Sequence, residues 1–238
     1  MKYSISPTTT TPKALLKQLG VKEKPKAVWF AYPMATFVTP EQYNDEMEIT
    51  AREVVSYGAD ECMAHALWDV CEDLRTSTDC TCTFGHEGGY QIVTILGDIC
   101  SKKGKPQDIA LLRDLAPVMQ TQALCGEGRA LASAVLQALD LFGPEIEAHI
   151  TKRSCPSGGC PAFKTYHILV SKCTGCGKCL KACDDRAIMG KAKFVHVIDQ
   201  RKCSQCDKCR EVCPEGAVVR AGAKKPKTPP RPIPCRRK

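Results

Sequence analysis

Eight cysteines near the C-terminal end follow one spacing twice, and this spacing is suited to holding iron–sulfur clusters. The first run is Cys173, Cys176, Cys179 and Cys183, and the second is Cys203, Cys206, Cys209 and Cys213, with Pro214 directly after it. Both runs read C-x2-C-x2-C-x3-C, and each cysteine has a counterpart 30 residues further along, which indicates an internal duplication. Three thiolates in one tight loop can bind three corners of an iron–sulfur cube, and the fourth corner must come from elsewhere.

In two-cluster ferredoxins of the bacterial type, the fourth cysteine of each run ligates the other cluster. We therefore predict two [4Fe–4S] clusters, one held by Cys173, Cys176, Cys179 and Cys213, the other by Cys203, Cys206, Cys209 and Cys183. The alternative is a pair of zinc knuckles or a disulfide framework. Zinc sites usually separate two C-x2-C pairs by a dozen or more residues, so the spacing favours clusters.

Composition places further limits on the chain. It has 238 residues and 17 cysteines, and we find no secretory signal and no apolar run near the ~20 residues that span a bilayer. Cysteine-rich chains of this kind usually hold metals in reducing compartments, which predicts a cytoplasmic protein without a membrane span. Of the net charge of +8, seven basic residues lie after Ala223, so the rest of the chain carries about +1 and nucleic acid is not an expected partner.

The pattern along the chain predicts an α+β protein: an antiparallel helical bundle followed by a bacterial-type 2[4Fe–4S] ferredoxin domain. We expect five parts: an N-terminal extension (1–59) that is partly extended and forms a subunit contact, the bundle (60–152), a Cys/Gly/Pro linker that is a candidate metal hinge (153–165), the ferredoxin domain (166–221) and a disordered, basic, Pro-rich tail (222–238).

Several local features give more specific expectations. Pro33 should make Ala27–Val38 an extended or edge segment rather than a central strand. Asp60 should cap the first bundle helix, and Pro144 should open a separate last helix. Strands are expected over Tyr166–Val170 and Phe194–Ile198, and Cys235 is expected to lie alone in the tail and bind no metal.

The bundle resembles the iron–sulfur helical domain at the C-terminal end of the NADH-binding flavoprotein subunit of respiratory complex I. The resemblance is carried by Asp60-Glu-Cys-Met, Glu87-Gly, Gln122-Ala-Leu-Cys125-Gly and Leu141-Phe-Gly-Pro-Glu-Ile-Glu-Ala-His149. Arg153-Ser-Cys-Pro-Ser-Gly-Gly-Cys160 and Phe194-Val-His-Val-Ile-Asp-Gln200 are closer to the flavoprotein (beta) subunit of electron-bifurcating hydrogenases. The resemblance covers about 60–221, and the glycine-rich loop that binds FMN and NADH in these proteins has no match here.

The family holds a further [4Fe–4S] cluster in this bundle, and its ligand pattern is altered in the present chain. The matching positions are Asp79, Cys82, Gly85 and Cys125, so two of the four cysteines are replaced. Cys80 offers a neighbouring thiol, which gives Cys80, Cys82 and Cys125 as the candidate ligands of an altered cluster, with an oxygen of Asp79 or a nitrogen of His86 as a fourth. A different metal and a bundle without metal are the alternatives.

His149, Cys155 and Cys160 form a second candidate metal site. One histidine and two cysteines can supply three corners of a tetrahedral zinc site, and Cys100 or Cys62 could supply the fourth. The alternative is a solvated histidine beside two buried thiols.

These features predict an iron–sulfur electron-transfer subunit of a multisubunit NAD(P)-linked oxidoreductase, similar to a hydrogenase or a formate dehydrogenase. A flavin- and NAD-binding subunit and other iron–sulfur subunits would be its partners. No Ser-His-Asp set, HExxH motif or P-loop is present. We therefore expect no catalytic residue, and we do not expect the chain to catalyse a reaction by itself. The alternatives are a free-standing ferredoxin with a docking domain and, in a different class, a zinc-dependent basic nucleic-acid-binding module.

Overall fold

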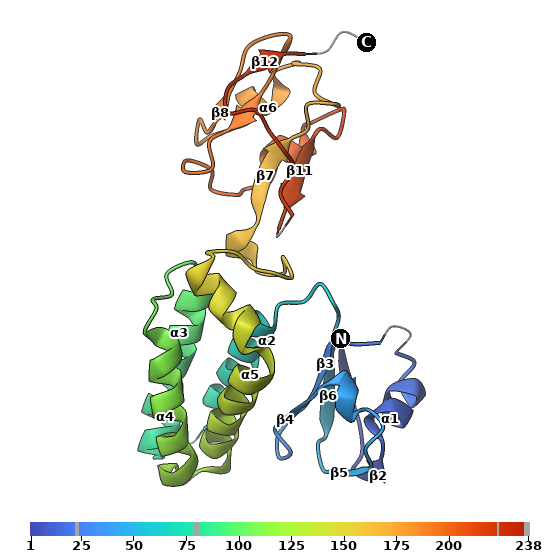
Figure 1. The fold of residues 1–238 in the computed structure, drawn as a ribbon, viewed down its shortest axis with the longest axis vertical. Helices are drawn as coiled ribbons and strands as arrows, with labels where there is room; N and C mark the ends of the chain where they lie inside the picture. Colours follow the sequence, from blue (N-terminus) through green and yellow to red (C-terminus); the bar gives the residue numbers. More distant parts are fainter. Residues whose placement is uncertain (22–23, 79–80, 223, 236–238) are drawn as a thin grey trace. The chain divides into compact units, whose positions relative to one another are not determined.

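The computed structural model describes residues 1–21, 24–78, 81–222 and 224–235. The chain divides into two compact units, Met1–Ala162 and Phe163–Lys238. Helices and small sheets occur in both, so the predicted α+β class is confirmed (Figure 1). Among the described residues, no helix is both long and apolar enough to cross a membrane.

The first part of unit 1 is a small sheet with one helix packed beside it. The strands β1 (Lys2–Ser4), β6 (Glu53–Tyr57), β3 (Ala27–Phe30) and β4 (Thr36–Val38) form an antiparallel sheet in the order β1-β6-β3-β4. A second pair joins β2 (Thr8–Thr10) to β5 (Met47–Ile49), and α1 (Pro12–Gln18) and a 3₁₀ turn (Pro40–Gln42) complete the layer. The expectation of an extended or edge segment over Ala27–Val38 agrees with β4, which lies at the sheet edge. It is wrong for β3, which ends at Phe30, before Pro33, and pairs on both sides.

The second part of unit 1 is the predicted helical bundle (Figure 1). Its helices are α2 (Met63–Thr76), α3 (Gly89–Cys100), α4 (Asp108–Gln122) and α5 (Gly126–Thr151), with a π-helical turn, Phe84–Gly88, leading into α3. Fully buried apolar side chains on all four helices, such as Leu67, Leu96, Leu112 and Leu131, form the core of the bundle. This burial, rather than helix propensity, is the main source of its stability.

Two predicted helix boundaries are wrong. Asp60 does not cap α2, which begins at Met63; the Met63 N–H instead donates to the Glu145 carboxylate at 3.2 Å. Pro144 does not open a new helix but lies inside α5. It is tolerated there because Pro144 and Asp140, whose carbonyl loses its partner, both lie on the exposed face, where water can satisfy that carbonyl.

The sheet of residues 1–59 packs onto α5 of its own chain. The Phe37 ring meets Phe142 edge-on at a centroid distance of 5.8 Å, and the Gln137 side chain accepts from the Phe37 N–H at 3.0 Å. Lys26 forms an ion pair with Glu145. The extension is therefore part of unit 1, while its predicted contact with another subunit stays a prediction.

Unit 2 is built from two interlocked repeats. In the first, β7 (Thr165–Ile168), α6 (Lys178–Lys181) and β8 (Ile188–Met189) surround the first cysteine run; in the second, β9 (Phe194–Val195), β10 (Val197–Ile198), α7 (Lys208–Glu211) and β11 (Val218–Ala221) surround the second run. The strand β7 pairs with β11 and β10 pairs with β8, both antiparallel, so each sheet takes one strand from each repeat. The expected strands are present, with a break between Val195 and Val197.

Part of the tail pairs with a strand of unit 2, where the sequence predicted disorder. A short strand, β12 (Ile233–Pro234), pairs with β9, and the Cys235 N–H donates to the Lys193 carbonyl at 2.9 Å. The expectation of a tail disordered over 222–238 is therefore wrong for this strand. Main-chain hydrogen bonds can fix a segment that has few apolar residues, and composition alone does not reveal such bonds.

Candidate metal centres

The two crossed sets of cysteines each surround a cavity in unit 2. One cavity is lined by Cys173, Cys176, Cys179 and Cys213, and a second is lined by Cys203, Cys206, Cys209 and Cys183. The strand exchange between β7 and β11 and between β8 and β10 carries the fourth cysteine of each run to the other loop. The structure thus brings together the sets that the spacing predicted.

Local geometry shapes both cysteine loops in the same way. Gly175 and Gly177 have φ values of 71° and 75°, and their counterparts Gln205 and Asp207 have 65° and 67°, so each loop makes two left-handed turns. Glycine is required at 175, because a Cβ there would lie 2.7 Å from the Phe194 nitrogen. These turns fold each loop around its cavity.

The sulfurs lie in matched polar surroundings. Ala187 N–H donates to Cys183 Sγ and Ala217 N–H donates to Cys213 Sγ, both at 3.3 Å. Burial raises the pKa of Cys179 to about 11, and the pKa of its counterpart Cys209 to about 11. A bound metal deprotonates such thiols, because the thiolate is the ligand.

Among the polar side chains that line the two cavities, Tyr166 and His196 differ most in their surroundings. Tyr166 lines the cavity of the second run; its pKa is raised by burial and by a hydrogen bond to Asp207. His196 lines the cavity of the first run and is 1% exposed. Neither ring nitrogen of His196 has a well-formed hydrogen bond within the described residues. Burial lowers its pKa, and the nearby main chain of Phe194 offsets this only in part.

Cys235 is not alone, contrary to the expectation. It packs against the core of unit 2, and its thiol contacts Cys173, a contact that, together with burial, raises the Cys235 pKa. The pairing of β12 with β9 brings it there. The expectation that Cys235 binds no metal stays a prediction.

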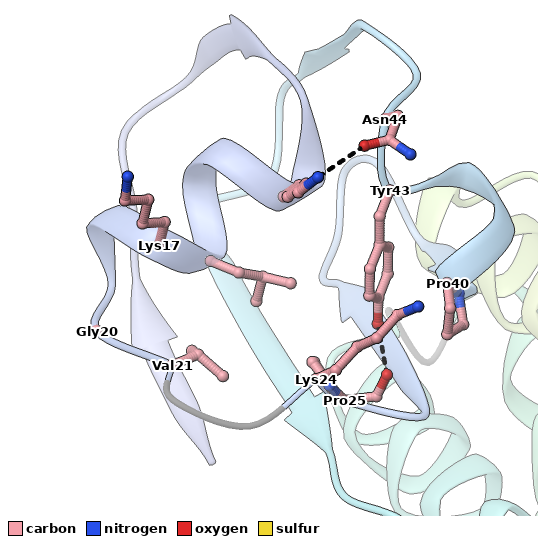
Figure 2. Close-up of a pocket in the computed structure, with 10 residues that line it drawn as sticks. Lys17, Gly20, Val21, Lys24, Pro25, Pro40, Tyr43 and Asn44 are labelled. Atoms are coloured by element: carbon pink, nitrogen blue, oxygen red, sulfur yellow. Dashed lines mark hydrogen bonds between the residues drawn. The ribbon is translucent and has the colours of Figure 1, made fainter.

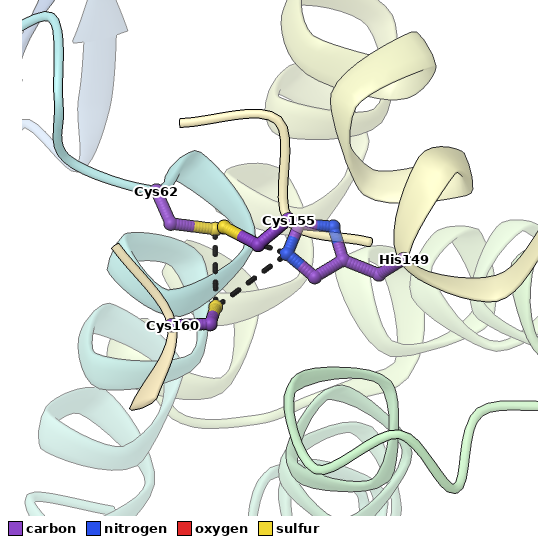
Figure 3. A group of neighbouring side chains, drawn as sticks. All are labelled: Cys62, His149, Cys155 and Cys160. Carbon is purple, nitrogen blue, oxygen red and sulfur yellow. Dashed lines mark hydrogen bonds between the residues drawn. The ribbon is translucent and has the colours of Figure 1, made fainter. Parts of the chain in front are cut away.

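Four buried side chains of unit 1 form a separate group with the composition of a zinc site (Figure 3). One ligand atom from each of Cys62, His149, Cys155 and Cys160 lies within 4.8 Å of the other three. Cys62 Sγ lies 3.3 Å from Cys160 Sγ and 3.3 Å from His149 Nε2. Of the two candidates for the fourth position, Cys62 is in this group, while Cys100 contacts Cys160 from beside it.

The elements around this group hold each member in place. Cys62 stands at the N-cap of α2 and His149 in the last turn of α5. The His149 Nδ1 atom lies 2.8 Å from the Glu145 carbonyl oxygen, so Nδ1 carries the proton and Nε2 faces the thiols. Gly159 lets the linker approach closely, because a Cβ there would lie 2.9 Å from the Cys62 nitrogen.

The pKa values of these four side chains depend on one another. Burial lowers the pKa of His149, but hydrogen bonds to Cys155 and Cys62 outweigh it and raise the pKa to about 10. Hydrogen bonds from Cys160 and Cys62 lower the pKa of Cys155. Contacts with Cys155 and Cys160 raise the pKa of Cys62, and contacts with Cys100 and Cys155 raise the pKa of Cys160. One thiolate therefore forms readily here, which favours a cation among the four side chains.

The altered cluster site of the bundle is only partly described. Cys80 and Asp79 lie outside the described residues. Cys82 and Cys125 are in contact, and the Cys125 N–H at the start of α5 donates to Cys82 Sγ at 3.3 Å. A Cβ on Gly85 would overlap Cys125 Sγ and lie 2.9 Å from Cys82 Sγ, so position 85 faces both thiols.

The Cys82 thiol is polarised although it is buried. Burial raises its pKa, but hydrogen bonds from Cys125 and from nearby main-chain groups outweigh this and lower it. The Nδ1 atom of His86 is also buried and has no hydrogen-bond partner within the described residues. Two thiols and a histidine thus remain candidate ligands at this site.

A cavity of about 600 Å³ lies beside α1 and was not predicted (Figure 2). Its lining combines Lys13, Lys17 and Lys24 with apolar side chains, and the Tyr43 hydroxyl at its wall donates to the Pro25 carbonyl at 3.0 Å. No cysteine, histidine or carboxylate is among the described residues that line it. Its lining is scattered over residues 13–44, and no motif marks it.

Comparisons with known families match two segments of the chain to iron–sulfur-binding regions. Residues 66–149 match the NADH-ubiquinone oxidoreductase-F iron-sulfur binding region, and residues 167–220 match the 4Fe-4S dicluster domain. The first match covers the bundle and the second covers both cysteine runs. The predicted resemblance is confirmed over these segments, and the chain therefore carries iron–sulfur-binding domains.

Similar proteins include subunits of larger enzymes. The chain is 34% identical over 137 residues to the NADP-reducing hydrogenase subunit HndC of Solidesulfovibrio fructosivorans, covering 58% of this chain and 28% of that protein. It is 39% identical over 75 residues to the F subunit of the NADH-quinone oxidoreductase of Streptomyces coelicolor, covering 32% of this chain and 17% of that protein. The chain thus spans less than a third of the length of these curated relatives.

Solved structures show the same fold at low sequence identity. An NAD⁺-reducing [NiFe]-hydrogenase matches in its H2-reduced and its air-oxidized state, each with a TM-score of 0.55 and 15% identity. Each match covers 60% of this chain and 26% of the matched chain.

Proposed function

We propose that this chain, whose two iron–sulfur-binding segments make up most of its length, is an electron-transfer subunit of a multisubunit NAD(P)-linked oxidoreductase. The observation that carries this proposal is the pair of cavities in unit 2, each lined by three cysteines of one run and one of the other. Four thiols around a cavity are the donor set of a [4Fe–4S] cluster. Each bound cluster would supply one-electron chemistry, and the chain would hold it, bury it and set its potential.

The same reasoning assigns the ligands. Cys173, Cys176, Cys179 and Cys213 would hold one cluster, and Cys203, Cys206, Cys209 and Cys183 the other. The main-chain N–H groups that donate to Cys183 and Cys213 would stabilise the negative charge on these sulfurs. The protein contributes positioning and electrostatics, while the cluster carries the electron.

Partners are proposed from the relatives. HndC and the Streptomyces protein are each named as one subunit of a larger enzyme, an NADP-reducing hydrogenase and an NADH-quinone oxidoreductase respectively. We infer that this chain assembles in the same way with a flavin- and NAD-binding subunit and with other iron–sulfur subunits. A cytoplasmic location fits the many free thiols, because reducing compartments do not keep disulfides.

Anaerobic purification of the chain tests the cluster proposal. We expect a brown protein with acid-labile sulfide and about eight irons per chain if only the two clusters of unit 2 are bound. Cys213→Ser and Cys183→Ser should each lower the iron content by removing a ligand of a different cluster. Cys71→Ser serves as the control, because Cys71 is a buried cysteine of α2 that lines neither of these cavities. A colourless protein without sulfide would refute the proposal.

We infer that Cys62, His149, Cys155 and Cys160 hold a structural zinc ion. Three thiolates and one imidazole are a common tetrahedral set for zinc, and the hydrogen bond from Nδ1 to Glu145 orients the ring as in known sites. Such an ion would join the start of α2, the end of α5 and the linker.

Metal analysis of variants tests this inference. We expect one zinc per chain in the wild type and none in Cys155→Ser. Cys100→Ser, which alters a thiol beside the group but outside it, should keep its zinc. Equal zinc contents in Cys155→Ser and the wild type would contradict the assignment.

At the bundle site we propose that a third, altered cluster forms when Cys80 joins Cys82 and Cys125. The contact between Cys82 and Cys125 supports a shared ligand site, and the match of residues 66–149 to an iron–sulfur binding region supports iron there. About twelve irons in the wild type and about eight in Cys80→Ser would agree with this proposal. About eight in both would contradict it.

A further inference from the structure

The internal duplication allows the two cavities of unit 2 to be compared position by position. Tyr166 precedes Cys173 by seven residues, and His196 precedes Cys203 by the same number. Because the repeats exchange strands, each of these side chains lines the cavity of the other run: Tyr166 that of Cys203, and His196 that of Cys173. The two positions are equivalent in the fold, and they carry different polar groups.

These polar groups also differ in whether they already have a partner. The Tyr166 side chain has a hydrogen bond to Asp207. His196 is 1% exposed, and neither of its ring nitrogens has a well-formed hydrogen bond within the described residues. A buried imidazole carries at least one N–H in either charge state, and leaving that donor unpaired is costly. The nearby main chain of Phe194 makes no well-formed hydrogen bond with either ring nitrogen, so the donor calls for an acceptor in the cavity that the ring lines.

The ring is also held in position. Gly190 lies against it so closely that a Cβ there would overlap Cδ2 and lie 2.9 Å from Nε2. The Lys193 N–H donates to the Gly175 carbonyl at 3.2 Å, which ties the segment before His196 to the first cysteine loop. The ring therefore has little freedom to turn away from the cavity.

We propose that His196 is a positioning residue that donates an N–H hydrogen bond to a sulfur of the cluster held by Cys173, Cys176, Cys179 and Cys213, which makes this cluster the higher-potential one of the two. The inference rests on the proposed binding of both clusters. The added electron comes from a redox centre of a partner subunit and increases the negative charge on the cluster sulfurs. A hydrogen bond to sulfur is stronger in that reduced state, so it raises the reduction potential.

The difference in potential would set the direction of electron transfer between the two clusters. An electron that reaches the cluster of the second run gains free energy by moving to the cluster of the first run. The cluster beside His196 would then be the one that stays reduced when one electron is present. The Tyr166 hydroxyl makes no matching contribution, because its hydrogen bond goes to Asp207.

A redox titration of the anaerobically purified full chain, followed by electron paramagnetic resonance, tests the proposal. His196→Phe keeps a ring but removes the N–H, and we expect the potential of one cluster to fall by about 59 mV, which is a tenfold change in the equilibrium constant for one electron. The other cluster should not shift. His196→Gln keeps an N–H donor and should retain most of the potential, and Tyr166→Phe, the matched control, should shift neither cluster comparably.

Three outcomes of this titration would overturn the proposal: unchanged potentials in His196→Phe, an equal shift of both clusters, or a shift in His196→Gln as large as in His196→Phe. A purely structural role of the ring predicts the last of these.

A second measurement covers the case in which His196→Phe loses its clusters. Wild-type protein with ¹⁵N-labelled histidine, reduced and studied by pulsed electron paramagnetic resonance, should show a weak ¹⁵N coupling on one cluster. Its absence would overturn the proposal even when the variant does not fold. Wild-type protein without iron would instead refute the proposed function, so the two failures are distinguishable.

Discussion

Replacement of Glu145 should destabilise unit 1 more than replacement of any exposed acid on the same helix. The Glu145 carboxylate forms an ion pair with Lys26, and it accepts from the Met63 N–H at 3.2 Å. The first contact ties the N-terminal sheet to α5, and the second caps α2 directly after Cys62. Both therefore fix the frame of the candidate zinc site.

The magnitude follows from the burial of the pair. The Lys26 and Glu145 side chains are 28% and 13% exposed. A surface ion pair stabilises the folded state by about 0–1 kcal/mol, and disruption of a fully buried pair costs about 3–5 kcal/mol. The contribution of this partly buried pair to stability should lie between these values. A lost helix cap adds about 1 kcal/mol. Glu145→Ala should thus cost about 2–3 kcal/mol.

Thermal unfolding of the zinc-loaded protein, followed by circular dichroism, measures this cost. For a unit of this size, about 2–3 kcal/mol lowers Tm by roughly 4–12 °C. Glu145→Gln keeps an acceptor for the Met63 N–H and should lose about half as much. Asp140 is on α5, as Glu145 is, and forms an exposed ion pair with Arg113 of α4, so Asp140→Ala should shift Tm little. Equal shifts in Glu145→Ala and Asp140→Ala would refute the reasoning.

Three further predictions concern other sites. Gly85→Ala would place a Cβ against Cys125 Sγ and should cost about 1–3 kcal/mol by overpacking, measured by chemical denaturation; an unchanged midpoint would contradict the close contact. The hydrogen bond to Asp69 raises the pKa of His65, so this pair adds stability below about pH 6.5 and loses it as pH rises through the raised pKa. Asp69→Asn should therefore cost about 0.3–0.5 kcal/mol at pH 5.5 and less at pH 8.5, and a larger loss at the higher pH would show that the sign is wrong. Cys235→Ser should leave the iron content unchanged, because four other thiols already line the neighbouring cavity; a loss of about four irons would make Cys235 a ligand.

The grouping of the eight ferredoxin cysteines could be predicted because the spacing itself encodes it. A repeat of 30 residues with three closely spaced thiols leaves one way to complete each set in an interlocked pair. The zinc candidate was predictable in part: His149, Cys155 and Cys160 are near one another in the chain. Cys62 is far from them in sequence, and only the packing of α2 against α5 separates it from Cys100 as the fourth member.

The wrong expectations share a physical origin. Asp60 has the side chain of a helix cap, but a carboxylate from another helix, that of Glu145, takes this role. Pro144 fits inside α5 because the carbonyl that loses its hydrogen bond lies on the exposed face, and this exposure depends on the tertiary packing. The strand in the tail depends on a partner, β9, nearly 40 residues earlier. Local sequence carries the preference, while distant contacts decide the result.

The exchange of strands between the repeats should make the insertion of one cluster into unit 2 favour the insertion of the other. Neither cavity is complete until both halves of the unit have met, because each takes one wall from the opposite half. Insertion of the first cluster brings the two halves together and closes the loop between them. The second insertion then no longer has to overcome the entropic cost of that closure. Cluster insertion should therefore be cooperative. Chains with both clusters and chains with none should be more abundant during assembly than chains with one cluster.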